Sequence, residues 1–320
     1  MKIGLYANDL NIFKPNYGRD GYAHRWYVLH QKFLDKKINL EVFNKCKDIS
    51  KYDIIIESGI QKLEHGNKYL LIIESTLVRP KDWDKIEHNN YKKIFCWDDD
   101  LVDNNKYFKL NYAFDIPQTI PKKFHDKKLC CTIAGNKFAN HRDELYTKRV
   151  EFIRWFEQNH PNDFDLYGTN WDQYRFGHSF LGRVLNKIKF LRKNNLFPLY
   201  QGMVDSKFET MSKYKFAICY ENIKDQSGYI TEKIFDCFFA GCVPIYWGAK
   251  NIAEHIPKEC FIDKREFKSF EDIYNYMQNM DKTKYMNYLD NIESFLNSSK
   301  ADPFRAETFA DTIVNEIIKL

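Results

Sequence analysis

The chain has 320 residues, and its 44% hydrophobic and 17% aromatic content is enough to bury two cores of ordinary domain size. Its 49 basic and 44 acidic residues leave a net charge of +5, and this mixture of signs argues against a dedicated nucleic-acid binder. No apolar run approaches the roughly 20 residues that are needed to cross a bilayer. The sequence shows no signal-peptide pattern, and its eight cysteines include no C-x-x-C pair. We therefore expect a cytoplasmic protein with reduced thiols.

Four short apolar runs in the first 125 residues predict buried strands of an α/β unit. They cover residues 3–6, 54–56, 69–73 and 94–97. Two of these runs lead into the same dipeptide, Glu57-Ser58 and Glu74-Ser75. Each therefore sends a carboxylate to the carboxyl edge of the sheet, where open α/β folds bind their ligands.

A linker is predicted over residues 114–126, because Pro117 and Pro121 interrupt any regular element there. The second part of the chain alternates strand and helix again, and the tail has the 3.6-residue apolar period of an amphipathic helix. The expected organisation is a Rossmann-like α/β domain at 1–125, a second one at 126–304, and a C-terminal helix at 305–320 that packs back towards the first domain.

Residues 174–201 interrupt the second domain with a basic amphipathic pattern. Leu181 and Val184 would share one helical face, while Arg183 and Lys187 supply charge. Such helices often lie on anionic membrane surfaces. The same pattern suits a surface helix packed on the domain, so peripheral contact with a membrane is one of two hypotheses.

The most informative stretch spans residues 214–248 and reads as strand, polar loop, helix and strand. Its helix opens with Thr231, Glu232 and Lys233 and stops at Gly241. A helix N-terminus presents unpaired N–H groups and a partial positive charge, Thr231 can cap it, and Lys233 adds a full charge, so this turn suits a diphosphate. The same three residues are also an ordinary helix start, so spacing alone leaves both interpretations open.

The run YENIKDQSGYITEKIFDCFFAGCVPIYWG, residues 220–248, resembles the signature of the glycosyltransferase family 10 fucosyltransferases, bacterial type. In that family an aromatic-Glu-Asn strand end is followed by Tyr-(Val/Ile)-Thr-Glu-Lys and then by (Val/Ile)-Pro-(Ile/Val)-aromatic-X-Gly. Weaker similarity extends to residues 133–136 and 260–263, where Cys260 replaces the usual serine, while residues 1–125 match only loosely. The resemblance implies a GT-B fold, in which two Rossmann-like domains face each other across a cleft.

The resemblance also implies a function. It points to an inverting transferase that moves fucose from GDP-fucose to a glycan hydroxyl in α-1,3 or α-1,4 linkage. The likeness to the family makes N-acetylglucosamine within a surface polysaccharide or lipopolysaccharide the expected acceptor. If residues 174–201 contact the inner face of the membrane, that acceptor would be lipid-linked. No nucleic acid is expected as a partner.

Donor binding is implied for the second domain. The expected contacts are Arg149, Glu221, Asn222, Tyr229, Thr231, Glu232 and Lys233. Lys233 and Arg149 would neutralise the departing diphosphate, with Arg142 as the alternative arginine, since a guanidinium fork grips a diphosphate bidentately. Because these cations can replace a metal ion, we expect no obligatory metal.

An inverting transferase also needs a base for the acceptor hydroxyl, and the resemblance points to a glutamate of the first domain. Glu74 is the preferred candidate and Glu57 its rival, while a purely structural carboxylate is the alternative for either. A carboxylate of ordinary pKa is ionised at neutral pH and can accept that proton.

The acidic triplet at residues 98–100 is the feature most suggestive of a metal, because D-X-D sequences hold a nucleotide-bound cation in the GT-A fold. It lies far in sequence from residues 214–248, so we expect a solvated loop. A metal-dependent transferase for another nucleotide sugar, or a catalytically silent protein that binds a nucleotide sugar or a glycan, are the rival functions.

Overall fold

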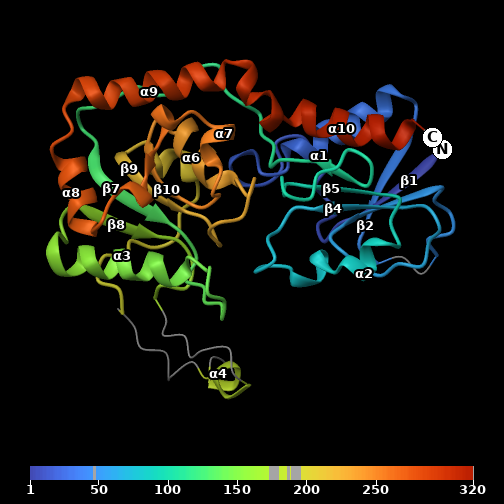
Figure 1. Cartoon of the computed structure of the whole chain (residues 1–320), viewed down its shortest axis with the longest axis horizontal. Coiled ribbons are helices and arrows are strands. Elements are labelled where there is room, and N and C mark those ends of the chain that lie inside the picture. Colours follow the sequence, from blue (N-terminus) through green and yellow to red (C-terminus); the bar gives the residue numbers. More distant parts are fainter. Residues whose placement is uncertain (46–47, 173–179, 186–187, 189–195, 320) are drawn as a thin grey trace.

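The protein consists of two parallel sheets, each covered by helices, that lie side by side along the long axis of the molecule (Figure 1). The computed structural model describes residues 1–45, 48–172, 180–185, 188 and 196–319. We call the first sheet with its helices the N-terminal unit, and the second sheet with its helices the C-terminal unit. The predicted α/β class is therefore confirmed for both parts of the chain.

The N-terminal unit contains a six-stranded sheet in the order β2-β1-β3-β4-β5-β6. Its strands are β1 (Lys2–Tyr6), β2 (Asn39–Phe43), β3 (Ile54–Ser58), β4 (Lys68–Ile72), β5 (Lys93–Cys96) and β6 (Tyr107–Lys109). The four predicted runs form β1, β3, β4 and β5, whose apolar side chains are buried on both faces as a parallel sheet requires. The pattern missed the edge strands, because β2 is half exposed and β6 has only 3 residues.

The C-terminal unit contains a five-stranded sheet in the order β11-β10-β9-β7-β8. Its strands are β7 (Lys128–Ile133), β8 (Phe164–Tyr167), β9 (Tyr214–Tyr220), β10 (Val243–Trp247) and β11 (Ile262–Asp263). The chain runs outward from β7 to β8 and then returns to place β9 on the other side of β7. The carboxyl ends of β7 and β9 thus flank a topological switch point, the usual ligand position in an open parallel sheet.

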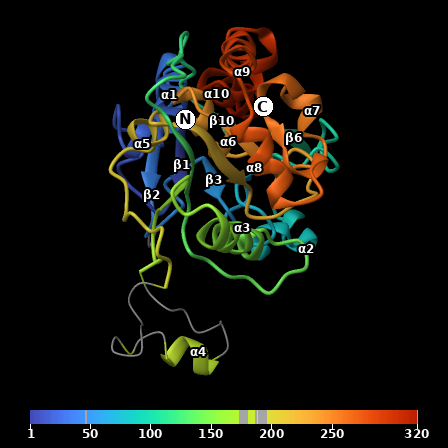
Figure 2. The ribbon, with the colours of Figure 1, turned by 90° about the vertical axis from the view of Figure 1, so that its left-hand side faces the viewer.

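Helices cover both sheets (Figures 1 and 2). They are α1 (His24–Asp35), α2 (Lys85–His88), α3 (Tyr146–Asn159), α4 (Phe180–Leu185), α5 (Lys207–Met211), α6 (Glu232–Phe239), α7 (Ile252–His255), α8 (Phe270–Gln278), α9 (Lys282–Leu296) and α10 (Ala306–Ile318). The sequence predicted α6 well, because its buried positions follow a helical period.

The C-terminal helix α10 belongs to the core of the N-terminal unit. Phe309 packs edge-on against Trp26 of α1, with ring centroids 5.4 Å apart, and Ile313 and Ile317 are buried in the same cluster. Just before α10, the backbone of Phe114 pairs with Phe304 and Ala306 through hydrogen bonds of 2.9 and 3.0 Å. The chain therefore crosses between the units twice at one place, which fixes them against each other.

Residues 98–100 do not form the solvated loop that the sequence predicted. Asp99 accepts hydrogen bonds from Asn251 at 2.9 Å and from His255 at 2.7 Å, both in the C-terminal unit, while Asp100 stays largely exposed. The prediction failed because distance along the chain hid this contact between the units. Among the described residues, no group of three or more His, Cys, Asp or Glu side chains is arranged to hold a metal ion.

Most of the predicted amphipathic segment at residues 174–201 lies outside the described residues. Within its described part, α4 projects away from both sheets (Figures 1 and 2), and the side chains of Leu181 and Val184 are 66% and 42% exposed. Seven cysteines are described, all buried and free, as expected for reduced thiols. No helix in the described ranges has the length and apolar character needed to span a membrane.

Gly241 ends α6 in the left-handed conformation, with φ of 62°, and a Cβ atom there would lie 1.9 Å from the carbonyl oxygen of Pro121. We expect Gly241→Ala to lower the free energy of unfolding by about 2–4 kcal/mol, because it combines left-handed strain with a backbone collision. Urea denaturation measures the change. Gly66→Ala is the control, since no atom lies within 4 Å of its added Cβ; equal effects of the two substitutions would contradict this explanation.

Candidate functional site

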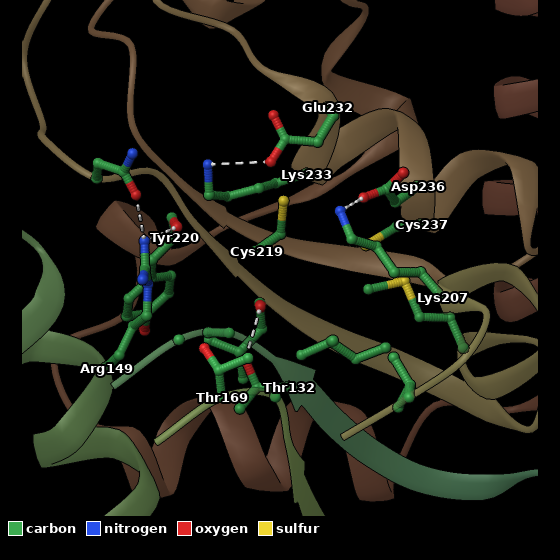
Figure 3. A pocket seen from close by; sticks show the side chains of 18 of the residues that line it. Thr132, Arg149, Thr169, Lys207, Cys219, Tyr220, Glu232, Lys233, Asp236 and Cys237 are labelled. Atoms are coloured by element: carbon green, nitrogen blue, oxygen red, sulfur yellow. Dashed lines mark hydrogen bonds and ion pairs between the residues drawn. The ribbon is translucent and has the colours of Figure 1, made fainter. Parts of the chain in front are cut away.

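A cavity of 430 Å³ opens at the switch point between β7 and β9. Its floor comes from Thr132 in β7, from Gly135 just after that strand, and from Cys219 and Tyr220 in β9. Side chains of α3 and α6 close it from two sides (Figure 3). Residues of the N-terminal unit, among them Glu74, complete the wall, so both units contribute to the site.

The buried carboxylate of Glu221 organises the loop between β9 and α6. Glu221 is fully buried, and it accepts hydrogen bonds from the backbone N–H of Thr231 at 2.9 Å and from the Thr231 hydroxyl at 2.7 Å. The ammonium group of Lys233 donates to the same carboxylate at 2.9 Å. This network connects the end of the strand to the first turn of the helix.

The structure differs from the capping prediction for this loop, and it places two predicted donor contacts off the cavity wall. Thr231 occupies the N-cap position of α6, but its side chain makes no capping hydrogen bond, because its hydroxyl is turned towards Glu221. Glu221 and Thr231 also do not line the cavity. Both lie behind its wall, where they hold Lys233 in place through hydrogen bonds of 2.9 Å.

Lys233 and Glu232 form an adjacent charged pair on the wall of the cavity (Figure 3). Burial by itself lowers the pKa of Lys233, but the carboxylates of Glu221 and Glu232 outweigh it and raise that pKa above its usual range. Burial by itself raises the pKa of Glu232, and the ammonium groups of Lys233 and Lys207 bring it down to about 2. Both side chains are therefore charged at neutral pH.

Arg149 reaches the cavity from α3 and is 5% exposed. Its Nη2 donates to the carbonyl oxygens of Tyr220 and Glu221 at 2.7 and 2.8 Å and to Oδ1 of Asn222 at 3.2 Å. Within the described part of the chain, its other guanidinium nitrogens donate to no protein acceptor. The alternative, Arg142, has a side chain that is 90% exposed and pairs with Asp143 away from the cavity, so the structure places Arg149 and not Arg142 at the site.

Tyr229 and Asn222 complete the part of the wall that the sequence predicted. The ring of Tyr229 is fully buried and lies 4.7 Å from the ring of Trp97, which comes from the N-terminal unit. The amide of Asn222 donates to the Tyr229 hydroxyl at 3.5 Å. The loop before α6 is thus held by aromatic packing between the units.

Glu74 and Glu57 lie in different environments, although their sequence contexts are alike. Glu57 is fully buried and accepts hydrogen bonds from the Tyr91 hydroxyl at 2.7 Å and the Gln61 backbone at 2.6 Å, outside the cavity. Glu74 is half-buried on the cavity wall, and no described residue donates a hydrogen bond to its carboxylate. Burial and the nearby charge of Glu232 raise the pKa of Glu74, against the cations around it.

A second charged pair lies on the wall and was not predicted from the sequence. Lys207, at the start of α5, lies 2.6 Å from Asp236 of α6, and both line the cavity (Figure 3). Burial raises the pKa of Asp236 to about 6 against the opposing effect of Lys207. Asp236 follows Glu232 by four residues on one helix, a spacing that puts both carboxylates on one face and could have identified it. No feature of the local sequence indicated that Lys207 would line the cavity.

Over residues 122–308 the chain matches the model of "Glycosyltransferase family 10 (fucosyltransferase) C-term". It is 38% identical over 87 residues to the alpha-(1,3)-fucosyltransferase FucT of Helicobacter pylori, a match that covers 27% of this chain and 18% of that protein. It is 38% identical over 80 residues to the alpha-(1,4)-fucosyltransferase of Arabidopsis thaliana, covering 24% and 20%. The chain thus matches about a fifth of the length of these curated relatives.

Solved structures share the whole fold. A crystal structure of an alpha1,3-fucosyltransferase with GDP superposes with a TM-score of 0.59 and 16% identity, covering 99% of this chain and 89% of that one. HepE of Anabaena, in complex with UDP and glucose, superposes with a TM-score of 0.58 and 11% identity over 100% of both chains. At these identities the likeness shows the fold alone, and it confirms the predicted GT-B architecture.

The Glu221 network predicts an unequal response to two charge deletions. We expect Glu221→Ala to lower the free energy of unfolding by about 3–5 kcal/mol, because it leaves Lys233 charged in a mostly buried position. Glu151→Ala removes one partner of the exposed Lys148–Glu151 pair, and we expect a change of no more than about 1 kcal/mol. Chemical denaturation of both variants is the measurement, and similar losses would contradict the assigned role of Glu221.

Proposed function

Because the chain belongs to glycosyltransferase family 10, the fucosyltransferases, we propose that it is an inverting enzyme that transfers fucose from GDP-fucose to a hydroxyl of a glycan. The proposed acceptor is N-acetylglucosamine in a surface polysaccharide or lipopolysaccharide, in α-1,3 or α-1,4 linkage. One observation carries the proposal. Two cations held by buried networks, Arg149 and Lys233, share one cavity with the carboxylate of Glu74, which has no partner among the described residues.

The diphosphate of the donor would lie between Arg149 and the first turn of α6. Arg149 keeps guanidinium donors free of protein acceptors within the described residues, and Lys233 uses hydrogen bonds to Glu221 and Thr231 that leave one ammonium hydrogen available. The first turn of α6 adds unpaired N–H groups and the positive end of the helix dipole. Because the cations are already fixed, they can stabilise the leaving diphosphate without reorganising.

Glu74 is the proposed base, on the wall of the same cavity as the cations. It would accept the proton of the acceptor hydroxyl as that oxygen forms a bond to the anomeric carbon of fucose. The bond from that carbon to the diphosphate breaks at the same time, and its electron pair leaves with GDP. Arg149 and Lys233 then carry the developing negative charge. Glu57 is a poorer candidate, since it is buried against Tyr91 and lies off the cavity wall.

The remaining donor contacts follow from the wall residues. Asn222 and Tyr229 are close enough to meet the nucleotide beside the diphosphate, and Glu232 would accept hydrogen bonds from hydroxyl groups of the ribose or the sugar. Since side chains supply the positive charge in this arrangement, we propose that no divalent metal is required. Activity that persists in excess EDTA would support this, and activity lost in EDTA and restored by Mg²⁺ or Mn²⁺ would refute it.

Incubation with GDP-fucose and a panel of glycans ending in β-linked N-acetylglucosamine, followed by mass spectrometry, tests the function. A product heavier by one deoxyhexose is the expected result. UDP-sugars belong in the same assay, because a UDP-bound protein shares this fold. Transfer from a UDP-sugar in preference to GDP-fucose would establish the rival transferase, and GDP-fucose binding with no transfer to any acceptor would favour the silent binding protein.

We also propose that the enzyme works in the cytoplasm at the inner face of the membrane, on a lipid-linked acceptor. The exposed apolar side chains of Leu181 and Val184 on the projecting α4 support this proposal. The double variant Leu181→Ser, Val184→Ser should then lose sedimentation with anionic vesicles. Ile86→Ser, which removes a 79% exposed apolar side chain from α2, is the matched control. Unchanged sedimentation of the double variant would contradict the proposal.

Glu74→Gln should reduce turnover by about 10²- to 10⁴-fold, the usual contribution of a general base, while the affinity for GDP stays within about twofold. Calorimetry measures the affinity, and steady-state kinetics at saturating donor measures turnover. Glu57→Gln, provided that it folds, should retain turnover. Loss of turnover in the Glu57 variant alone would move the base to that residue.

The pH profile gives an independent check on the base. Glu74 must be ionised, and its pKa is raised, so the acid limb of kcat should lie above the ordinary glutamate pKa of about 4.3. Glu232→Gln removes a neighbouring negative charge that raises this pKa, so at saturating donor the limb should move to lower pH. A limb that stays in place would argue against Glu74.

A further inference from the structure

A second cavity, of 470 Å³, lies between the two units next to the first. Tyr112, Glu232 and Asp236 line both cavities, so the two cavities share a wall. The other side of the second cavity is formed by Tyr22 and Arg25 of the N-terminal unit. Of the proposed donor contacts, only Glu232 belongs to its lining.

Arg25 is the feature of this cavity that needs an explanation. It lies in the first turn of α1 and is 5% exposed. No carboxylate pairs with it among the described residues, and its Nε is fully buried without a hydrogen-bond partner. Buried arginines are rare unless paired, because removing a charge from water costs free energy that a partner must offset.

The local surroundings of Arg25 hold its position without satisfying its donors. The guanidinium carbon lies 5.4 Å from the ring centre of Tyr22 and 5.6 Å from those of Trp26 and Tyr112. Aromatic rings attract a cation through their faces, but they do not accept its in-plane N–H groups as a carboxylate or phosphate does. The first turn of α1 contains no acidic side chain, and the helix dipole there disfavours a cation. An anion next to Arg25 would accept hydrogen bonds from its free N–H groups and would also offset its unfavourable interaction with the helix dipole.

The acidic side chains of the cavity are already engaged with other groups. Asp236 pairs with Lys207 at 2.6 Å. Asp20 accepts hydrogen bonds from the Ser206 hydroxyl at 2.7 Å and from the Lys207 backbone at 2.8 Å. Glu232 pairs with the ammonium group of Lys233 at 3.7 Å. Glu74, on the wall of the first cavity, interacts with Arg25 only through its charge, which opposes the rise that burial causes in the pKa of Glu74. Arg25 therefore has no ion-pair or hydrogen-bond partner among the described residues.

We propose that the second cavity holds the acceptor glycan and that Arg25 binds an oxyanion on it, either the carboxylate of an acidic sugar or a phosphate ester. The inference rests on the proposed function and names the chemical class of its acceptor. The planar fork of Arg25 matches either oxyanion bidentately. The exposed ring of Tyr22 and the buried ring of Tyr112 offer apolar faces to the sugar beside it. The acceptor hydroxyl would then approach Glu74 from this side.

Three matched disaccharides test this assignment on the GDP-loaded protein. One is hexosyl-N-acetylglucosamine, the second carries a uronic acid in place of the hexose, and the third carries a phosphate ester on the hexose. We expect at least one acidic disaccharide to bind about ten- to a hundredfold more tightly than the neutral one, as a charge-assisted contact provides. The acidic disaccharide that binds more tightly shows whether the oxyanion is a carboxylate or a phosphate ester.

Arg25→Gln should bring the ratio of acidic to neutral affinity close to one, and Arg25→Lys should leave an intermediate ratio, because it keeps the charge without the fork. Arg142→Gln, which removes an exposed positive charge elsewhere, should leave the ratio unchanged. Retained affinity for GDP shows that each variant is folded. The same ratio should appear in kcat/KM for fucosyl transfer.

Several results would overturn this inference alone. No preference for either acidic disaccharide in the wild-type protein would do so. If Arg25→Gln lowered the affinity for the acidic and the neutral disaccharides equally, Arg25 would act through Glu74. If the variant bound GDP more weakly, Arg25 would belong to the donor site. Failure of the proposed function is a separate outcome, because there the wild-type protein would either not bind GDP or transfer no fucose to any of the three disaccharides, whatever their charge.

Discussion

The fully buried carboxylate of Glu221 is the interaction on which the site depends. It sits where β9 ends, and it holds the Thr231 backbone, the Thr231 hydroxyl and the Lys233 ammonium group at once. A buried carboxylate is stable only if its acceptors are filled, so this one carboxylate fixes the entry of the chain into α6. Arg149 also binds the end of β9, where its Nη2 donates hydrogen bonds to the carbonyl oxygens of Tyr220 and Glu221. The cations of the cavity are thus held by the end of a strand in the core.

A second set of contacts fixes the position of the two units relative to each other. The linker and the start of α10 lie side by side through Phe114 and Ala306, and the tail then returns to the first core. Asp99 joins the units through Asn251 and His255. Because Glu74 comes from one unit and Lys233 from the other, the chemistry we propose is possible only while these contacts hold the cleft at its working width.

The site contains both paired and unpaired charged side chains. Glu221, Asp236 and Asp20 each have a defined protein partner and serve the architecture. Glu74 and Arg25 have none among the described residues, and both face space between the units. A fold that satisfies most of its buried charges leaves such groups unpaired at a cost in stability, and functional sites are where that cost is usually found.

Local sequence was sufficient for the central strands, for α6 with its stop at Gly241, for the α/β class, and for the resemblance that identified Arg149, Lys233 and Glu74 as candidates. These features depend on apolar periodicity and on residues close together in the chain, so they can be read without a structure. Local pattern could not separate Glu74 from Glu57, could not show that Glu221 and Thr231 support the wall instead of lining it, and misjudged residues 98–100. It gave no sign of Lys207 or Arg25 either. Those distinctions depend on which side chains meet across β9, α6 and the interface between the units, and only the packing of segments far apart in the sequence decides which charges are paired and which remain free to bind.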